Sequence, residues 1–235
     1  ERMAEEDSRL PSVSPARKLR ENATNRATRA ANGEARLPIE GSDLLFWNGY
    51  GGFDPESRDY IIRLRAGDAT PHPWINVISN GTFGFHIAAE GAAFTWSSNS
   101  RDYQLTPWSN DTVVNRPGEG FYIHDKDSHE VLSPFAAFGR SREAIYEVRH
   151  GPGRSVFSTT DVGLKLEMVQ IVAPDAPAKI MRMKIVNLTE RPRNLRVYAF
   201  AEWVLGNNRP KTAPYLRTWY EPSVNALMAQ NPFSV

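Results

Sequence analysis

Short runs of alternating apolar and polar residues follow one another from Leu44 to the end of the chain. Phe83, Phe85 and Ile87, for example, alternate with smaller or polar residues. A period of two places successive side chains on opposite faces of a strand, and Gly, Pro, Asn and Asp between the runs are typical of hairpin turns. Helical periodicity is almost absent from this region. The pattern therefore predicts an all-β fold, a large antiparallel β-sandwich over residues 41–235.

The middle of the chain contains the clearest hairpin. Phe121–His124 and Glu130–Leu132 flank the turn Asp125-Lys126-Asp127-Ser128, whose residues favour turns because their side chains bond the nearby backbone. No internal repeat of fixed period is present, which disfavours a propeller or a solenoid. The same alternation predicts strands in AIYEVRHG, RSVFSTTD, LKLEMVQIVAP, AKIMRMKIVNLT, NLRVYAFAEWVLG, YLRTWYEP and NALMAQNPF.

A glycine-rich segment opens the predicted sandwich. LLFWNGYGGFDPESRDYIIRL predicts a strand, a turn at NGYGG, a second turn at Asp54-Pro55 and a strand at Tyr60–Leu64. NGYGG lacks the GK[ST] ending of a phosphate loop, so we expect its glycines to supply positive φ and close backbone approach. Pro71 and Pro73 precede the next apolar run and predict a strand entered from an edge or a bend.

The N-terminal region differs in composition from the rest. Residues 1–40 are poor in large apolar side chains, and Ala16–Ala31 offers only a thin apolar stripe for a helix. We expect a linker or interdomain tail that is partly helical, with plain disorder as the alternative. The opening ERMAEEDSRL and the ending NPFSV lead us to expect a piece of a longer chain, with the sandwich truncated at its C-terminal end.

Charge and cysteine content narrow the classes of partner. Lys plus Arg number 28 and Asp plus Glu 27, so a net charge of +1 gives no field to gather nucleic acid or anionic lipid. Cysteine is absent, which excludes disulfides and thiolate metal sites and fits a reducing compartment. No apolar run approaches the roughly 20 residues needed to cross a bilayer, and no signal peptide is recognisable. We therefore expect a cytoplasmic location and no nucleic-acid partner.

The sequence offers little for metal or nucleophilic chemistry. The five histidines show no zinc spacing, so we expect no metal site, and no GxSxG motif supports a hydrolase triad. For His150 we favour a structural hydrogen bond over a ligand contact. Among carboxylates, Glu202 lies in an apolar run, where a buried salt bridge is the better expectation than a catalytic acid. The carboxylates that qualify as acids by residue type alone are Asp102, Asp111, Glu119 and Glu202.

One stretch, Phe94–Asp111, combines aromatic and polar side chains densely. Aromatic faces cover the apolar surface of a sugar ring, while amide, guanidinium and carboxylate groups bond its hydroxyls. A surface loop pinned to the core by its tryptophans is the alternative, and these residues alone leave both open.

The order of several longer motifs resembles a known family. WNGYGGFDPESRDYIIRL, TPHPWINVISN, FGFHIAAEGAAFTWSSNSRDYQLTPWSND, PGEGFYIHD and YEVRHGPGRSVF resemble the N-terminal β-sandwich of glycoside hydrolase family 94, a galactose-mutarotase-like supersandwich. The likeness is strongest to the phosphorylase-like region of cyclic β-1,2-glucan synthases and to β-1,2-oligoglucan phosphorylases. It covers the chain from about Leu44 onward.

This resemblance implies an activity that the chain does not carry alone. In the family, an Asp of an (α/α)6 barrel protonates the glycosidic oxygen while inorganic phosphate attacks the anomeric carbon, with inversion. The resemblance implies that the barrel belongs to the same polypeptide and that this fragment is inactive without it. It implies no cofactor and no catalytic residue here. It also allows a homodimer and, for a full-length synthase, the cytoplasmic side of the inner membrane.

The resemblance also implies a role for the polar stretch, as a lining of the acceptor side of a β-glucan or glucooligosaccharide site. Arg101 and Gln104 are expected to bond hydroxyls and Trp96 or Trp108 to stack on a glucose ring, whereas Trp47 and Trp74 are expected in the core. An autonomous carbohydrate-binding module and a purely structural domain are the alternatives. The predicted carbohydrate-binding residues are Trp96, Asn99, Arg101, Gln104, Trp108 and Asn110.

Overall fold

Antiparallel strands dominate the structure, a computed structural model that describes residues 39–108, 115–141 and 143–233. These residues belong to one unit that spans Ile39–Val235. The strands are β1 (Gly51–Phe53), β2 (Tyr60–Arg65), β3 (Ile75–Ser79), β4 (Phe83–Ala88), β5 (Ala93–Ser97), β6 (Glu119–Asp125), β7 (Val131–Leu132), β8 (Ile145–Gly151), β9 (Arg154–Asp161), β10 (Leu164–Val172), β11 (Lys179–Asn187), β12 (Leu195–Ala201), β13 (Arg217–Glu221) and β14 (Ala226–Gln230). The short helices are η1 (Ala136–Phe138), α2 (Arg209–Thr212) and η2 (Ala213–Tyr215).

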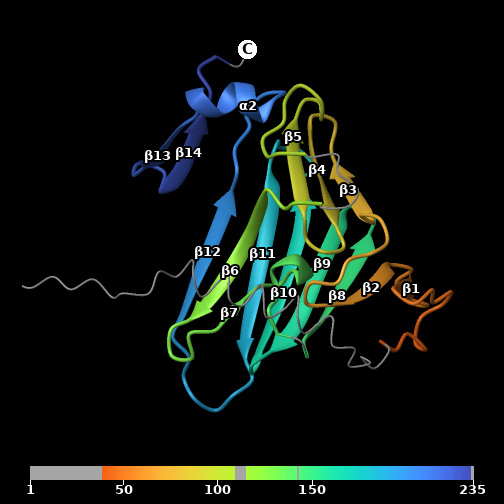
Figure 1. Cartoon of the computed structure of the whole chain (residues 1–235). Coiled ribbons are helices and arrows are strands. Elements are labelled where there is room, and N and C mark those ends of the chain that lie inside the picture. Colours follow the sequence, from red (N-terminus) through yellow and green to blue (C-terminus); the bar gives the residue numbers. More distant parts are fainter. Residues whose placement is uncertain (1–38, 109–114, 142, 234–235) are drawn as a thin grey trace, which may run out of the picture. The chain divides into compact units, whose positions relative to one another are not determined.

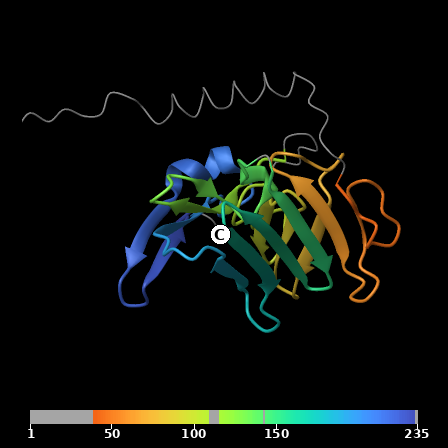
Figure 2. The same ribbon diagram turned by 90° about the horizontal axis from the view of Figure 1, so that it is seen from below.

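The strands form one large sheet and three small ones. The large sheet has the order β1-β2-β8-β9-β10-β11, and the small sheets have the orders β3-β4-β5, β12-β6-β7 and β13-β14. Figures 1 and 2 show the two three-stranded sheets in front of the large sheet, with the β13-β14 hairpin at one end. The two three-stranded sheets thus form the second layer of a sandwich.

Two clusters of buried residues hold the layers together. In the first, Tyr146 and Phe157 of the large sheet pack against Phe85 and Ile87 of β4. In the second, Ile123 of β6 packs with leucines of β10. Strand β10 shows why the sequence pattern produces this arrangement, because its buried residues alternate with more exposed ones along most of its length. The predicted all-β sandwich is therefore confirmed.

The first glycine-rich segment folds differently from the prediction. Gly51 and Gly52, expected in the turn, form strand β1 together with Phe53 and pair with β2. Leu45, expected in a strand, makes only an isolated bridge to Phe53. The expected glycine roles are present. Gly49 has a φ of +97°, and a Cβ on Gly51 would lie 2.6 Å from the carbonyl oxygen of Ile61. This segment is therefore a strand because its backbone pairs with β2, although its sequence shows no alternation of apolar and polar side chains.

Several other predictions can be compared with the structure. The β6-β7 hairpin is present, and Asp125 Oδ1 accepts hydrogen bonds from the amides of Asp127 and Ser128 in its turn. Trp74 is partly buried against the first cluster, and Trp47 is likewise only partly buried. The predicted tail, residues 1–40, falls almost wholly outside the described residues and stays a prediction. Within the described ranges, no helix has the length and apolar character needed to cross a membrane.

Candidate functional site

The polar stretch leaves β5 through a tight loop that its own side chains stabilise. The amide of Ser97 donates to the carbonyl of Tyr103 at 3.0 Å. Asn99 Oδ1 accepts hydrogen bonds from the amides of Arg101 (3.0 Å) and Asp102 (2.8 Å). Such an Asx turn fixes the backbone locally. The Asn99 carbonyl is therefore engaged in the loop, and the side chains of Arg101 and Asp102 are left exposed.

A distant segment joins this loop through the backbone of Gln104. Its amide donates to the carbonyl of Gly206 at 3.0 Å, and the amide of Gly206 donates back to the carbonyl of Gln104 at 3.1 Å. The same residue makes an isolated bridge to Trp96 in β5. This pairing brings Asn207, Asn208 and the start of α2 beside the polar loop.

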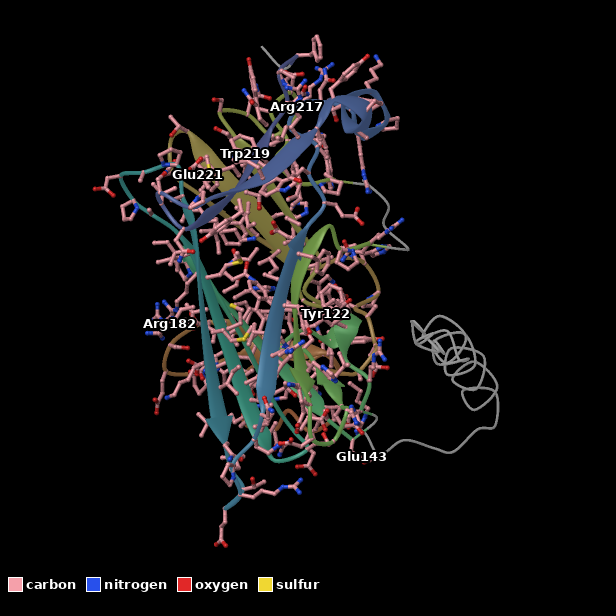
Figure 3. The ribbon with its side chains drawn as sticks, turned by 90° about the vertical axis from the view of Figure 1, so that its left-hand side faces the viewer. Tyr122, Glu143, Arg182, Arg217, Trp219 and Glu221 are labelled. Carbon is pink, nitrogen blue, oxygen red and sulfur yellow. The ribbon has the colours of Figure 1, made fainter. Side chains whose placement is uncertain are left out.

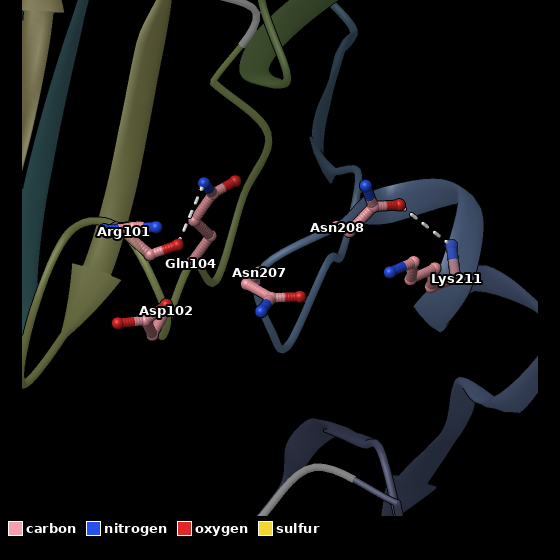
Figure 4. A pocket seen from close by; sticks show the side chains of 6 residues that line it. All are labelled: Arg101, Asp102, Gln104, Asn207, Asn208 and Lys211. Carbon is pink, nitrogen blue, oxygen red and sulfur yellow. Dashed lines mark hydrogen bonds between the residues drawn. The ribbon is translucent and has the colours of Figure 1, made fainter.

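The two segments enclose a polar pocket of about 310 Å³ (Figure 4). Gln104 Nε2 donates to the carbonyl of Arg101 at 3.4 Å, and Asn208 Oδ1 caps α2 by accepting from the amide of Lys211 at 3.2 Å. Two cations, one carboxylate and three amides therefore offer both donors and acceptors, as a polyhydroxylated ligand requires. The residues that line the pocket are Arg101, Asp102, Gln104, Asn207, Asn208 and Lys211.

The predicted aromatic residues of the stretch lie outside this lining. Trp96 covers the backbone of β4, where a Cβ added to Gly84 would be 2.5 Å from its ring. Trp108 stacks on Phe94, with ring centroids 5.7 Å apart and an 18° angle between the planes. Trp108 is 48% exposed. Burial lowers the pKa of His86, whose ring lies 6.3 Å from that of Trp108, and the imidazole is neutral at pH 7.

The structure thus groups only part of the predicted site. Arg101 and Gln104 share the pocket, whereas Asn99, Trp96 and Trp108 do not line it. Asn110 and Asp111 lie outside the described residues. The sequence reasoning missed Asn207, Asn208 and Lys211. The sequence feature that indicates them is the polar run GNNRPK, which lies between two apolar segments.

The remaining polar candidates make contacts within the fold. Glu119 forms an ion pair with Lys179 and accepts a hydrogen bond from Thr95 at 3.2 Å. Glu202 follows β12 rather than lying inside a strand, and its side chain, 26% exposed, forms an ion pair with Arg209 at 2.5 Å. The expected pairing of Glu202 is therefore present, although the group is not fully buried.

The histidines also lie in structural surroundings. His150 is largely enclosed, and its Nδ1 lies 2.9 Å from Ser155 Oγ, which confirms the expected structural hydrogen bond. The rings of His124 and His129 are 6.2 Å apart. In the part of the chain that the structure describes, no three His, Cys, Asp or Glu side chains gather as a metal site.

Layered antiparallel sheets make the described unit a β-sandwich domain, and a polar pocket lies between the loop after β5 and the start of α2. The chain belongs to the glycosyl hydrolase 94 family, because the model of its supersandwich domain matches residues 58–235.

Similarity to individual proteins agrees with this family. The chain is 53% identical over 207 residues to the cyclic β-(1,2)-glucan synthase NdvB of Rhizobium meliloti (strain 1021), a match over 88% of this chain and 7% of the relative. N,N'-diacetylchitobiose phosphorylases of Vibrio proteolyticus and Vibrio furnissii are 26% and 25% identical, each over 66% of this chain and 19% of the relative. The chain therefore spans only a small part of the length of these relatives.

Proposed function

We propose that this chain is the sandwich domain of a β-glucan-acting enzyme and lines the acceptor side of its glucan site. The observation that carries the proposal is the polar pocket in which Arg101 and Gln104 face Asn207 and Lys211 (Figure 4). Its mixture of charged and amide groups suits sugar hydroxyls, which both donate and accept hydrogen bonds. The 53% identity to a protein named as a cyclic β-(1,2)-glucan synthase supports a β-1,2-glucan as the ligand.

In this proposal the chemistry takes place elsewhere in the same polypeptide. Inverting phosphorolysis or glycosyl transfer needs a general acid and, for phosphorolysis, a site for inorganic phosphate, both on the (α/α)6 barrel that the family resemblance implies. The sandwich contributes binding and orientation, which act on the acceptor rather than on the bond that breaks. A homodimer and a location at the cytoplasmic side of the membrane are parts of the same proposal.

The test is kinetic and uses the complete gene product that carries this sequence. Arg101→Ala and Lys211→Ala each remove a charged donor from the pocket. We expect the KM for β-1,2-glucooligosaccharides to rise at least about tenfold, because a charged hydrogen bond contributes roughly 1.5–3 kcal/mol. The kcat should change less than about twofold. Arg182→Ala, which removes an exposed arginine of β11 (Figure 3), is the control and should change neither constant. If the KM is unchanged in both pocket variants, the domain does not contact the glucan through this pocket and its role is structural.

A second function, an autonomous carbohydrate-binding module, follows from one feature of the pocket. All of its lining residues come from this unit, so no other domain is needed to form it. Calorimetric titration of the 235-residue protein with β-1,2-glucooligosaccharides separates the two functions. An acceptor lining should bind only in the millimolar range, because the pocket is small and the rest of the site is absent. Micromolar affinity would establish the module instead.

A further inference from the structure

One wall of the polar pocket is held in place without buried side chains. Asn207, Asn208 and Lys211 form this pocket wall, just before α2 and in α2 itself. Neither α2 nor the adjoining η2 contains a buried residue. A segment of this kind gains little from apolar burial and depends on hydrogen bonds and local contacts for a defined position. Its contacts with the rest of the fold therefore determine where the three side chains lie.

The chain enters the pocket wall through a strained backbone. Leu205 has a φ of +46°, in the left-handed region that residues with a Cβ avoid. Such a conformation persists only where the surrounding structure holds it. On one side, the amide of Val204 donates to the carbonyl of Leu105 at 2.9 Å. On the other side, Gly206 is the residue that pairs with Gln104. The direction in which the chain enters the wall is thus set at Leu205.

The carbonyl of Leu205 has a hydrogen-bond partner from a distant segment. Asn231, which follows β14, donates from its Nδ2 to this carbonyl at 3.0 Å. The side chain of Asn231 is itself fixed, since its Oδ1 accepts from the amide of Phe233 at 3.1 Å. Asn231 is also partly buried. Its amide group therefore connects the end of the β13-β14 hairpin to the strained residue at which the pocket wall begins.

The same segment contacts the chain at the far end of the pocket wall. The rings of Phe233 and Tyr215 have centroids 4.7 Å apart and an angle of 60° between their planes. Tyr215 is the last residue of η2, which directly follows α2. Figure 1 shows the segment after β14 running past α2. Residues 231–233 thus contact the chain on both sides of the pocket wall, although they do not line the pocket themselves.

We propose that Asn231 is a positioning residue for the polar pocket. Its hydrogen bond to the Leu205 carbonyl fixes the direction in which the chain enters the pocket wall. The contact between Phe233 and Tyr215 supports the other end of the wall. Asn231 acts through the wall rather than on the ligand. The proposal rests on the proposed function, because it takes the glucan as the ligand of this pocket.

Kinetics of the complete gene product test this role. Asn231→Ala should raise the KM for β-1,2-glucooligosaccharides about fivefold and leave kcat within about twofold, because a loosely held wall must be ordered on binding. Asn231→Asp keeps the size of the side chain, but an ionised carboxylate cannot donate, so it should have the same effect. Asn225→Ala is the matched control, since it removes a hydrogen bond with Tyr220 in the turn of the same hairpin. It should leave both constants unchanged.

A double variant shows whether Asn231 acts through the pocket wall. In the Lys211→Ala background, Asn231→Ala should raise the KM less than about twofold, because the charged donor that it positions is then absent. A rise by the same factor in both backgrounds would contradict the proposal, since the two residues would then act independently.

Hydrogen exchange in the complete gene product follows the pocket wall without reference to the ligand. The amides of Gly206 and Lys211 are hydrogen-bonded at its two ends. In Asn231→Ala they should exchange at least about fivefold faster, and in the control variant at an unchanged rate. Unchanged exchange overturns the proposal, and so does faster exchange with a KM that only Lys211→Ala alters. Faster exchange with a KM that neither variant alters would support the positioning role and reject the proposed function.

Discussion

At the scale of single residues, burial determines the protonation state of His150. Its ring is enclosed beside Phe157, and its Nδ1 is 2.9 Å from Ser155 Oγ. Burial lowers the pKa of His150 to about 4, whereas a histidine in an unfolded chain titrates near 6.5. The unfolded state therefore binds the proton first as the pH falls. The neutral imidazole is part of the native core at neutral pH.

This difference predicts an acid-dependent loss of stability. Between pH 6.5 and about 4 the unfolded state holds the extra proton, so the free energy of unfolding falls as the pH falls and is unaffected above that range. The full effect is on the order of 3 kcal/mol. His150→Gln should flatten the dependence by that amount when urea unfolding is measured at pH 7 and pH 4. His72→Gln, which changes an exposed histidine, is the control and should leave the pH dependence of stability unaltered. A pH dependence in His150→Gln that equals that of the unmodified protein would contradict the prediction.

The sequence predicted single residues well where one local interaction decides the outcome. The pairing of Glu202 is of this kind, because a charged group in an apolar run needs a partner. The hydrogen bond of His150, beside the Gly-Pro-Gly bend, is another. Where a side chain has two possible uses, the sequence is less informative. The ligand contact of Asn99 stays a prediction, and in the structure its Oδ1 accepts hydrogen bonds from two amides of its own loop. Residue type does not distinguish these two uses.

At the scale of elements, side-chain alternation predicted most strands because the two faces of each sheet meet different surroundings. Strand β10 keeps this alternation over most of its length. The method failed at Gly51–Phe53, because glycine has no side chain to show the period. Pairing with β2 makes that segment a strand, and pairing partners are not visible in a local pattern.

The β9-β10 turn offers a prediction about an element. Val162 and Gly163 connect the paired residues Asp161 and Leu164, and both have positive φ, +39° and +78°. This two-residue turn suits Asn-Gly, and a β-branched residue is strained there. Val162 is 45% exposed, so little burial is lost on its replacement. Val162→Asn should raise the free energy of unfolding by about 1 kcal/mol in urea titrations.

The neighbouring residue supplies the matched control for this turn. Gly163→Ala places a Cβ at φ +78° and within 2.5 Å of Thr189 Cγ2, so it should destabilise the protein. The prediction is supported if the free energy of unfolding rises in Val162→Asn and falls in Gly163→Ala. A loss of stability in Val162→Asn would show that the strain at Val162 is smaller than the contacts its side chain makes.

At the scale of the described unit, the pocket shows the limit of sequence reasoning. Its two walls are about a hundred residues apart in the chain, and the Gln104–Gly206 pairing joins them. No periodicity encodes such a contact, which depends on how the strands are arranged in space. The polar stretch after β5 was recognised from its composition, whereas its counterpart at Asn207 and Lys211 was not.

An ion pair connects the layers of the sandwich and provides the last prediction. Lys179 of β11 in the large sheet pairs with Glu119 of β6 in the small sheet, and its Nζ lies 4.2 Å from the centre of the Phe85 ring. The side chains are only 7% and 14% exposed. Burial lowers the pKa of Lys179, and the carboxylate of Glu119 partly opposes this shift. Each charge therefore depends on the other to remain buried.

Removing one charge should cost more than removing both. Lys179→Met leaves a buried carboxylate without its cation and should lower the free energy of unfolding by about 3–5 kcal/mol. The double variant Lys179→Met, Glu119→Gln should recover most of that loss, because a neutral pair needs less solvation. A denaturation cycle with both single variants measures the coupling. A loss of less than about 1 kcal/mol in Lys179→Met would contradict the prediction.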